Sequence, residues 1–114
     1  MPNFIYDAFY KDKIKVVPEL KILEEYLTPL ALGVWIMDDG GKASAGLKLS
    51  TNSFTYEEVL LLCEVLNKKY KLEARPNKGG ELNQYIIYIP GKSMKILDEI
   101  VKEYIHPTMR YKVK

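Results

Sequence analysis

The sequence predicts an α+β domain in which helices cover one face of an antiparallel sheet. Three patterns predict this fold class: an almost wholly apolar helix at residues 30–37, alternation of apolar and polar residues near 46–52 and 72–75, and two more helices that each carry one apolar stripe. The expected order is helix, one or two strands, helix, two strands, helix, or α-β-β-α-β-β-α in its complete form. With 114 residues, 47% of them hydrophobic, the chain is one small domain or a fragment of something larger.

The first helix has clear signals at both ends. Thr28 is the expected N-cap, and Pro29 fits the first turn, where its missing N–H costs nothing. The segment 30–37 is apolar nearly all round, so most of its sides must be buried. Asp38 and Asp39 follow, and a glycine in the left-handed conformation is expected to end the helix at residues 40–41.

The remaining elements follow from alternation, turns and caps. Residues 46–52 are typical of a half-buried strand, and a short partner strand fits at 42–45. Thr55 and Glu58 form a capping box that starts the second helix. Further expectations are a strand at 72–75, a turn at 76–80, a return strand at 83–89, and a third helix from near Ser93 to Pro107.

Residues 1–27 differ from the rest of the chain. A short helix is expected near residues 3–10, followed by a connector rich in lysine and valine. We expect residues 1–27 to be a linker or the tail of a preceding domain, because nothing in them completes the core pattern. Residues 28–114 then form the domain.

The composition excludes several kinds of site. Cys63 is the only cysteine, so no internal disulfide can form, and its apolar neighbours indicate a core position. His106 is the only histidine, which argues against a zinc site built on histidines or a Ser-His-Asp triad and favours a role at a helix terminus. No apolar run has the length of a membrane span, and a signal peptide is missing, so we expect an intracellular protein with no membrane partner.

The charge of the chain is informative through its distribution. A net charge of +2 is too small to announce a nucleic-acid-binding protein by itself. Basic residues, however, gather in the segments expected to be strands and loops, whereas acidic residues gather in the expected helices. A basic sheet face is therefore expected.

Two acids stand where a helix end disfavours them. Asp38 and Asp39 follow the apolar helix, whose C-terminal end is already partly negative, so each costs about 0.3–1 kcal/mol. A divalent cation held by hard oxygen ligands would offset this cost, and phosphate chemistry would need such a cation. The alternative is that both acids are exposed residues beside a Gly-Gly turn.

The segment 27–42 closely resembles the second motif of the LAGLIDADG homing endonucleases. It contains Leu-Thr-Pro and then Trp-Ile-Met-Asp-Asp-Gly, and residues 32–40 fall on the nine letters of the family name. Val34 departs from the glycine that the family has at that position. The resemblance continues through residues 49–59, 86–89 and 104–112, so that it covers about 26–112.

This resemblance implies a LAGLIDADG half-domain with a saddle-shaped antiparallel sheet and a metal-dependent, site-specific endonuclease activity. It implies that Asp39 is a catalytic residue and a ligand of Mg²⁺ or Mn²⁺, and that Asp38 contributes a second ligand through its backbone carbonyl. Lys112 is implied to be the catalytic group that polarises the attacking water or stabilises the phosphate charge. No small-molecule cofactor is expected.

The same resemblance implies a second repeat. In the family, two motif helices pack side by side, and this motif is similar to the second repeat of two-repeat enzymes. We therefore expect a homodimer or a partner half, and the residues expected at the helix interface are Leu30, Gly33, Val34 and Met37.

Double-stranded DNA is the partner that the resemblance implies for the sheet, which lies in the major groove in this family. The residues expected to contact DNA, on the strands and in the loop 76–80, are Lys42, Lys48, Ser50, Asn52, Arg75, Asn77 and Lys78. For each residue, the alternative to a DNA contact is an ordinary solvated strand face. For Glu73 the two interpretations are about equally supported. The last strand is ambiguous, because Tyr85 and Ile87 face one way, Ile86 and Tyr88 the other, and neither face is cleanly polar.

A second class of function stays open. Maturases share this fold and bind intron RNA without needing the acids, and some relatives only bind nucleic acid. Intact Asp39 and Lys112 favour the nuclease, because a pure binder has no reason to keep acids at a negative helix end. The dominance of lysine over arginine, with many Ile and Tyr, suggests an AT-rich genome such as that of an organelle or a phage, so a mitochondrion or plastid is an expected location.

Overall fold

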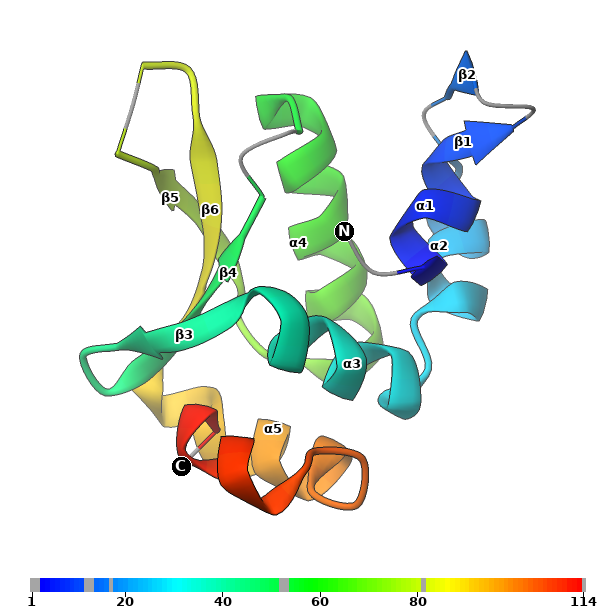
Figure 1. Ribbon diagram of the computed structural model, residues 1–114. Coiled ribbons are helices and arrows are strands. Elements are labelled where there is room, and N and C mark those ends of the chain that lie inside the picture. The colour runs from blue at the N-terminus through cyan, green and yellow to red at the C-terminus, as the bar shows by residue number, and fades with distance from the viewer. Residues whose placement is uncertain (1–2, 12–13, 17, 52–53, 81, 114) are drawn as a thin grey trace.

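The computed structural model describes residues 3–11, 14–16, 18–51, 54–80 and 82–113. Its elements, drawn in Figure 1, are α1 (Asn3–Phe9), β1 (Tyr10–Lys11), β2 (Ile14–Lys15), α2 (Leu20–Tyr26), α3 (Pro29–Asp39), β3 (Gly40–Ala43), β4 (Gly46–Ser50), α4 (Tyr56–Tyr70), β5 (Arg75–Lys78), β6 (Tyr85–Ile89), α5 (Met94–Val101) and the 3₁₀ helices η1 (Gly91–Ser93) and η2 (Pro107–Lys112).

A four-stranded antiparallel sheet of order β3-β4-β6-β5 forms the body of the domain. In Figure 1 the sheet lies on the left, α4 and α3 lie to its right, and α5 lies below it. The short helices α1 and α2 lie on the far right, away from the sheet, beside the small β1–β2 hairpin. The α+β class, with an open antiparallel sheet and helices, is confirmed.

The helix α3 is built as its sequence predicts at the start and differently at the end. Thr28 Oγ1 accepts a hydrogen bond from Ala31 N–H at 3.1 Å. The helix continues through both acids, and Gly40 then has extended backbone (φ −84°, ψ 154°). The prediction that a glycine in the left-handed conformation ends the helix is therefore wrong. A Cβ at Gly40 would lie 2.5 Å from Ile36 O, which explains the glycine: α3 turns into β3 with no room for a side chain.

The strand β5 begins later than the alternation predicts. Lys71 and Glu73 have positive φ (57° and 54°), so the backbone of 71–74 is not extended. The side chain of Asn67 holds this segment, since its Nδ2 donates to Ala74 O (2.9 Å) and its Oδ1 accepts from Ala74 N–H (2.6 Å). The prediction of a turn at 76–80 is therefore wrong at its first residues, because Pro76 lies in β5, an edge strand in which proline is tolerated.

The N-terminal segment is part of the core. Ile5, Phe9, Leu23 and Leu27 are at most 1% exposed, and the Phe9 ring meets the Phe54 ring edge-on. The expectation that nothing before residue 28 completes the core is wrong, because helices of seven residues are too short to show a periodic stripe. The domain boundary at residue 27, as a statement about a longer protein, stays a prediction.

The two remaining helices differ in how well their ends are predicted. In the capping box of α4, Thr55 Oγ1 accepts from Glu58 N–H (3.2 Å) and Glu58 Oε1 accepts from Thr55 N–H (2.8 Å), as expected. The last helix α5 ends at Val101, before the predicted end at Pro107, and turns follow it. Among the described residues, no helix is long and apolar enough to cross a membrane.

Candidate functional site

The C-terminal end of α3 and the C-terminal segment of the chain meet at one place. Asp38 is exposed and Asp39 is partly buried at the last turn of α3. Lys112 Nζ donates a hydrogen bond of 3.0 Å to the carbonyl of Met37, 75 positions earlier in the chain. The structure thus brings the two predicted catalytic residues, Asp39 and Lys112, to the same helix end.

A small network holds this C-terminal segment against α3. His106 N–H contacts Met37 Sδ at 3.4 Å, and the His106 ring caps η2 by accepting from Thr108 N–H at 3.2 Å. Arg110 pairs with Asp98 of α5 at 3.2 Å. Lys112 therefore reaches α3 from a segment that several contacts hold in place. His106 caps the start of η2 and does not lie at the end of the third helix, where the sequence placed it.

The carboxyl group of Asp39 lies in an environment that disfavours its charge. Burial raises the pKa of Asp39 above its ordinary value, and neighbouring Asp38 raises it further. The Trp35 indole and the Lys112 ammonium group act in the opposite direction. A cation at this helix end would reverse the balance, and carboxylate and carbonyl oxygens are the hard ligands that Mg²⁺ prefers.

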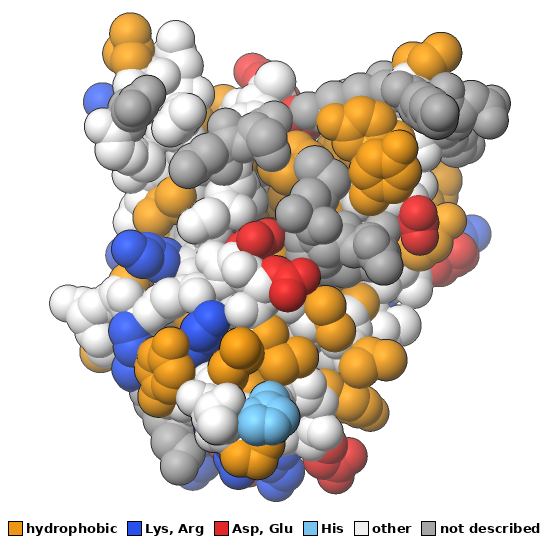
Figure 2. Space-filling view, in the orientation of Figure 1, with side chains coloured by type: hydrophobic (Ala, Val, Ile, Leu, Met, Phe, Trp, Pro, Cys, Tyr) orange, Lys and Arg blue, Asp and Glu red, His pale blue; other side chains and the backbone are white. Residues whose placement is uncertain are grey.

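Within the described ranges, no group of three or more His, Cys, Asp or Glu side chains is placed so that it could hold a metal ion. The acids that α3 brings to its end are Asp38 and Asp39. Figure 2 shows acidic side chains near the middle of this face, with hydrophobic side chains over α3 on one side and lysine and arginine side chains over the strands on the other.

The register of the sheet divides the residues expected to bind DNA into two groups. Directly opposed residues point to the same side of a sheet, and alternate residues along a strand share that side. The rows Gly41–Lys48–Tyr88–Arg75 and Ser50–Ile86–Asn77 define one side, which we call the outer face. Four predicted residues share it: Lys48, Ser50, Arg75 and Asn77.

The other predicted DNA contacts are placed differently. Lys42 lies opposite the buried Leu47, and Lys78 lies opposite Tyr85, so both point to the side that the helices cover, on the two edge strands. The structure thus places Lys78 in β5 and away from the outer face, not in a loop. Glu73 lies outside the sheet and pairs with Lys92 at 3.1 Å, and Asn52 lies outside the described residues.

The residues expected at a helix interface also fall into two groups in the structure. Leu30 is 54% exposed, and Val34 and Met37 are partly exposed on the same stripe of α3. Gly33 is buried instead, because a Cβ there would lie 3.0 Å from the Cβ of Tyr104 in the same chain. The close approach that requires this glycine is therefore made within the chain.

Tyr88 and Ile86 are two residues of the outer face that the sequence pattern does not assign to either side of the sheet. Both are partly exposed in the central strand β6, where apolar and aromatic residues stand at every position and hide the alternation. The register with Lys48 and Ser50 decides which side they take. Only knowledge of the strand pairing could have found them.

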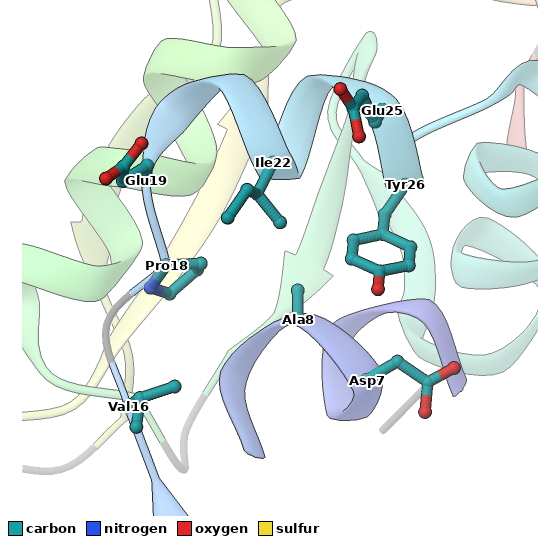
Figure 3. Close-up of a pocket in the computed structure, with 8 residues that line it drawn as sticks. All are labelled: Asp7, Ala8, Val16, Pro18, Glu19, Ile22, Glu25 and Tyr26. Carbon is teal, nitrogen blue, oxygen red and sulfur yellow. The ribbon is translucent and has the colours of Figure 1, made fainter. Parts of the chain in front are cut away.

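A separate cavity of about 400 Å³ lies between α1 and α2. Figure 3 shows Ala8, Ile22 and Tyr26 pointing into the space between the two helices; the other residues that line it are Asp7, Val16, Pro18, Glu19 and Glu25. None of these residues belongs to the end of α3 or to the outer face.

An open antiparallel sheet with a polar outer face, joined to a helix that ends in two acids beside a lysine, has the features expected of a nucleic-acid-binding α+β domain. The chain belongs to the LAGLIDADG DNA endonuclease family, whose model matches residues 2–97.

Relatives and one solved structure agree with this membership. The chain is 47% identical to cytochrome b mRNA maturase bI2 of Saccharomyces cerevisiae, over 97% of the chain and 27% of that protein. It is 44% identical to intron-encoded endonuclease ai4 of Dictyostelium discoideum, over 97% of the chain and 69% of that protein. The structure of the homing endonuclease I-WcaI bound to its DNA recognition sequence matches with a TM-score of 0.82 and 32% identity, over 96% of this chain and 50% of that one. The chain thus spans about a quarter of the yeast maturase and half of the solved endonuclease.

Proposed function

We propose that this chain is one half of a site-specific endonuclease that hydrolyses phosphodiester bonds of double-stranded DNA with Mg²⁺ or Mn²⁺. The observation that carries the proposal is the end of α3, where Lys112 Nζ lies 3.0 Å from Met37 O beside the partly buried Asp39. Membership of the endonuclease family and the DNA complex of the solved relative support the choice of DNA.

The residues have distinct roles in this proposal. The carboxylate of Asp39 and the backbone carbonyl of Asp38 hold the cation, which when bound makes a water molecule more acidic and offsets negative charge on the phosphate. Lys112, fixed by its bond to Met37 O, presents a positive charge next to the reacting phosphate. The outer face grips the duplex through Lys48 and Arg75.

A second repeat completes the enzyme in this proposal. One half contributes one acid pair and one lysine. The stripe of Leu30, which is exposed, and of Val34 and Met37, which are partly exposed, leads along α3 to those acids. A second motif helix on this stripe would bring a second pair of acids alongside the first. A homodimer and a partner half within a longer protein both meet the requirement.

A maturase that binds intron RNA is the second candidate. The observation in its favour is that two relatives, at 47% and 43% identity, are named cytochrome b mRNA maturases. Because cytochrome b is a mitochondrial protein, the same relatives support our proposal that the chain acts in an organelle. They favour a mitochondrion over a plastid. A maturase needs an RNA-binding surface and does not need the acids of α3.

A cleavage assay separates the two candidates. The chain, as a homodimer or with a partner half, is given a duplex site selected from a random pool, with Mg²⁺. We expect Asp39→Asn and Lys112→Met to lose cleavage by at least about 100-fold while keeping DNA binding. Glu64→Gln and Lys95→Met, which change exposed residues of α4 and α5, are the matched controls and should cleave normally.

Full cleavage by Asp39→Asn would refute the endonuclease proposal. Tight and selective binding of structured intron RNA, together with no cleavage of DNA by the unaltered chain, would establish the maturase instead.

A further inference from the structure

The outer face carries a contact between Arg75 of β5 and Tyr88 of β6. The two residues are directly opposed in the register, and the guanidinium carbon of Arg75 lies 5.3 Å from the centre of the Tyr88 ring. This distance is within the range of a cation–π interaction. Among the described residues, Arg75 forms no ion pair with an acid, and the nearby Glu73 pairs with Lys92 instead.

The ring of Tyr88 is itself fixed on the sheet. A Cβ placed on Gly46 of β4 would lie 3.0 Å from Tyr88 Oη and 3.1 Å from its Cε1. The ring therefore reaches across the space that the missing side chain of Gly46 leaves on the neighbouring strand. Tyr88 is partly buried, whereas Arg75 on its other side is exposed.

This arrangement suits base recognition better than simple attraction to phosphate. A guanidinium group that rests on an aromatic ring loses rotational freedom and keeps its in-plane N–H donors available. Two such donors match the O6 and N7 acceptors of guanine in the major groove. A lysine at this position would supply charge without that geometry.

We infer that Tyr88 is a positioning residue that holds Arg75 for the recognition of one guanine in the DNA site. The inference rests on the proposed function, because it takes the outer face as the DNA-binding surface. Arg75 is expected from the sequence to contact DNA; the inference adds guanine as the base that it reads and Tyr88 as the residue that holds it.

The test uses 7-deazaguanine, which removes the N7 acceptor and leaves base pairing intact. The chain binds a duplex site selected from a random pool, and each guanine of the site is replaced in turn. We expect one replacement to lower affinity about 5- to 10-fold. Arg75→Ala should bind more weakly and lose that sensitivity, and Arg75→Lys should recover part of the affinity without the sensitivity.

Variants of Tyr88 then test the positioning role. Tyr88→Phe keeps the ring and should keep the full sensitivity, whereas Tyr88→Leu and Tyr88→Met remove the ring and should reduce it to less than twofold. The readout is the ratio of the affinities for the guanine and 7-deazaguanine duplexes, because a merely structural defect that weakens binding to both duplexes leaves this ratio unchanged. Two ring-free variants are used so that a folding defect in one leaves the other. Tyr56→Leu, which removes a ring that packs on Tyr85 away from the outer face, is the control for loss of a tyrosine.

The outcomes separate this inference from the proposed function. The inference alone is overturned if the chain binds duplex DNA and Arg75→Ala keeps the sensitivity to 7-deazaguanine. It is also overturned if both ring-free variants discriminate like the unaltered chain. No binding of any duplex by the unaltered chain overturns the proposed function and the inference with it.

Discussion

Replacing Asp39 by Asn should stabilise the chain in the absence of a divalent cation. Asp39 lies in the last turn of α3, where the helix end carries about half a negative charge, and its carboxyl group is partly buried beside Asp38. Removing one carboxylate from such an end is worth about 0.3–1 kcal/mol, and partial burial favours the upper part of that range. For a chain of this size the gain corresponds to an increase in Tm of roughly 1–4 °C.

The gain should depend on pH in a definite direction. The folded chain raises the pKa of Asp39 above 3.8, so the folded state binds this proton more tightly than the unfolded state does. The contribution of Asp39 to stability is therefore most favourable below about pH 3.8 and declines as pH rises through the raised folded value. Asp39→Asn has no such decline, so its advantage should be near zero at pH 3 and complete at pH 7.

Thermal unfolding followed by circular dichroism in EDTA, at several pH values from 3 to 7, measures this effect. Asp38→Asn is the matched control, because Asp38 lies at the same helix end but is exposed. Its gain at pH 7 should be smaller. If Asp39→Asn were no more stable at pH 7, or if its gain were the same at pH 3, the account of a disfavoured charge at this helix end would be wrong.

Three further changes test other parts of the structure. Lys112→Met removes the bond to a terminal carbonyl of α3 and should cost roughly 1 kcal/mol in urea unfolding, whereas equal stability would show that the bond does not form in solution. Leu30→Asp should weaken association with a second copy or partner half in sedimentation. Gly33→Leu should instead lower Tm, because its new side chain would meet Tyr104 of the same chain, and a normal Tm would contradict that packing. Lys48→Ala should reduce the slope of log affinity for DNA against log salt concentration by about one unit if Lys48 contacts a phosphate. Lys78→Ala should reduce this slope less, since the register turns Lys78 to the other side of the sheet. A larger effect of Lys78→Ala than of Lys48→Ala would place the DNA elsewhere.

The parts of this molecule that local sequence predicts are those fixed by neighbouring residues. The N-caps of α3 and α4 depend on contacts three residues apart, and both form as predicted at Thr28 and Thr55. The apolar character of α3 predicts burial, and Trp35 and Ile36 are fully buried. Such features need no knowledge of the rest of the fold.

The parts that were mispredicted depend on distant contacts. The start of β5 is set by the left-handed residues Lys71 and Glu73 and by the Asn67 side chain, none of which alternation can reveal. The side taken by Lys42 or Lys78 depends on which residue each strand places opposite, and a shift of one residue reverses it.

The end of α3 combines both kinds of information. The sequence shows the two acids and predicts that their negative charges are disfavoured there. It does not show which positively charged side chain the fold brings near them. The structure supplies one lysine: Lys112 Nζ bonds to Met37 O and lowers the pKa of Asp39 in part. Burial still leaves the pKa of Asp39 raised, and the negative helix end also disfavours its charge. A divalent cation would favour the charged carboxylate, and a second motif helix packed on Leu30 and Val34 would bring a second disfavoured pair of acids beside the first. In the proposed enzyme, the cation and the second repeat are therefore linked, because cations between two such helix ends would reduce the repulsion between their acids.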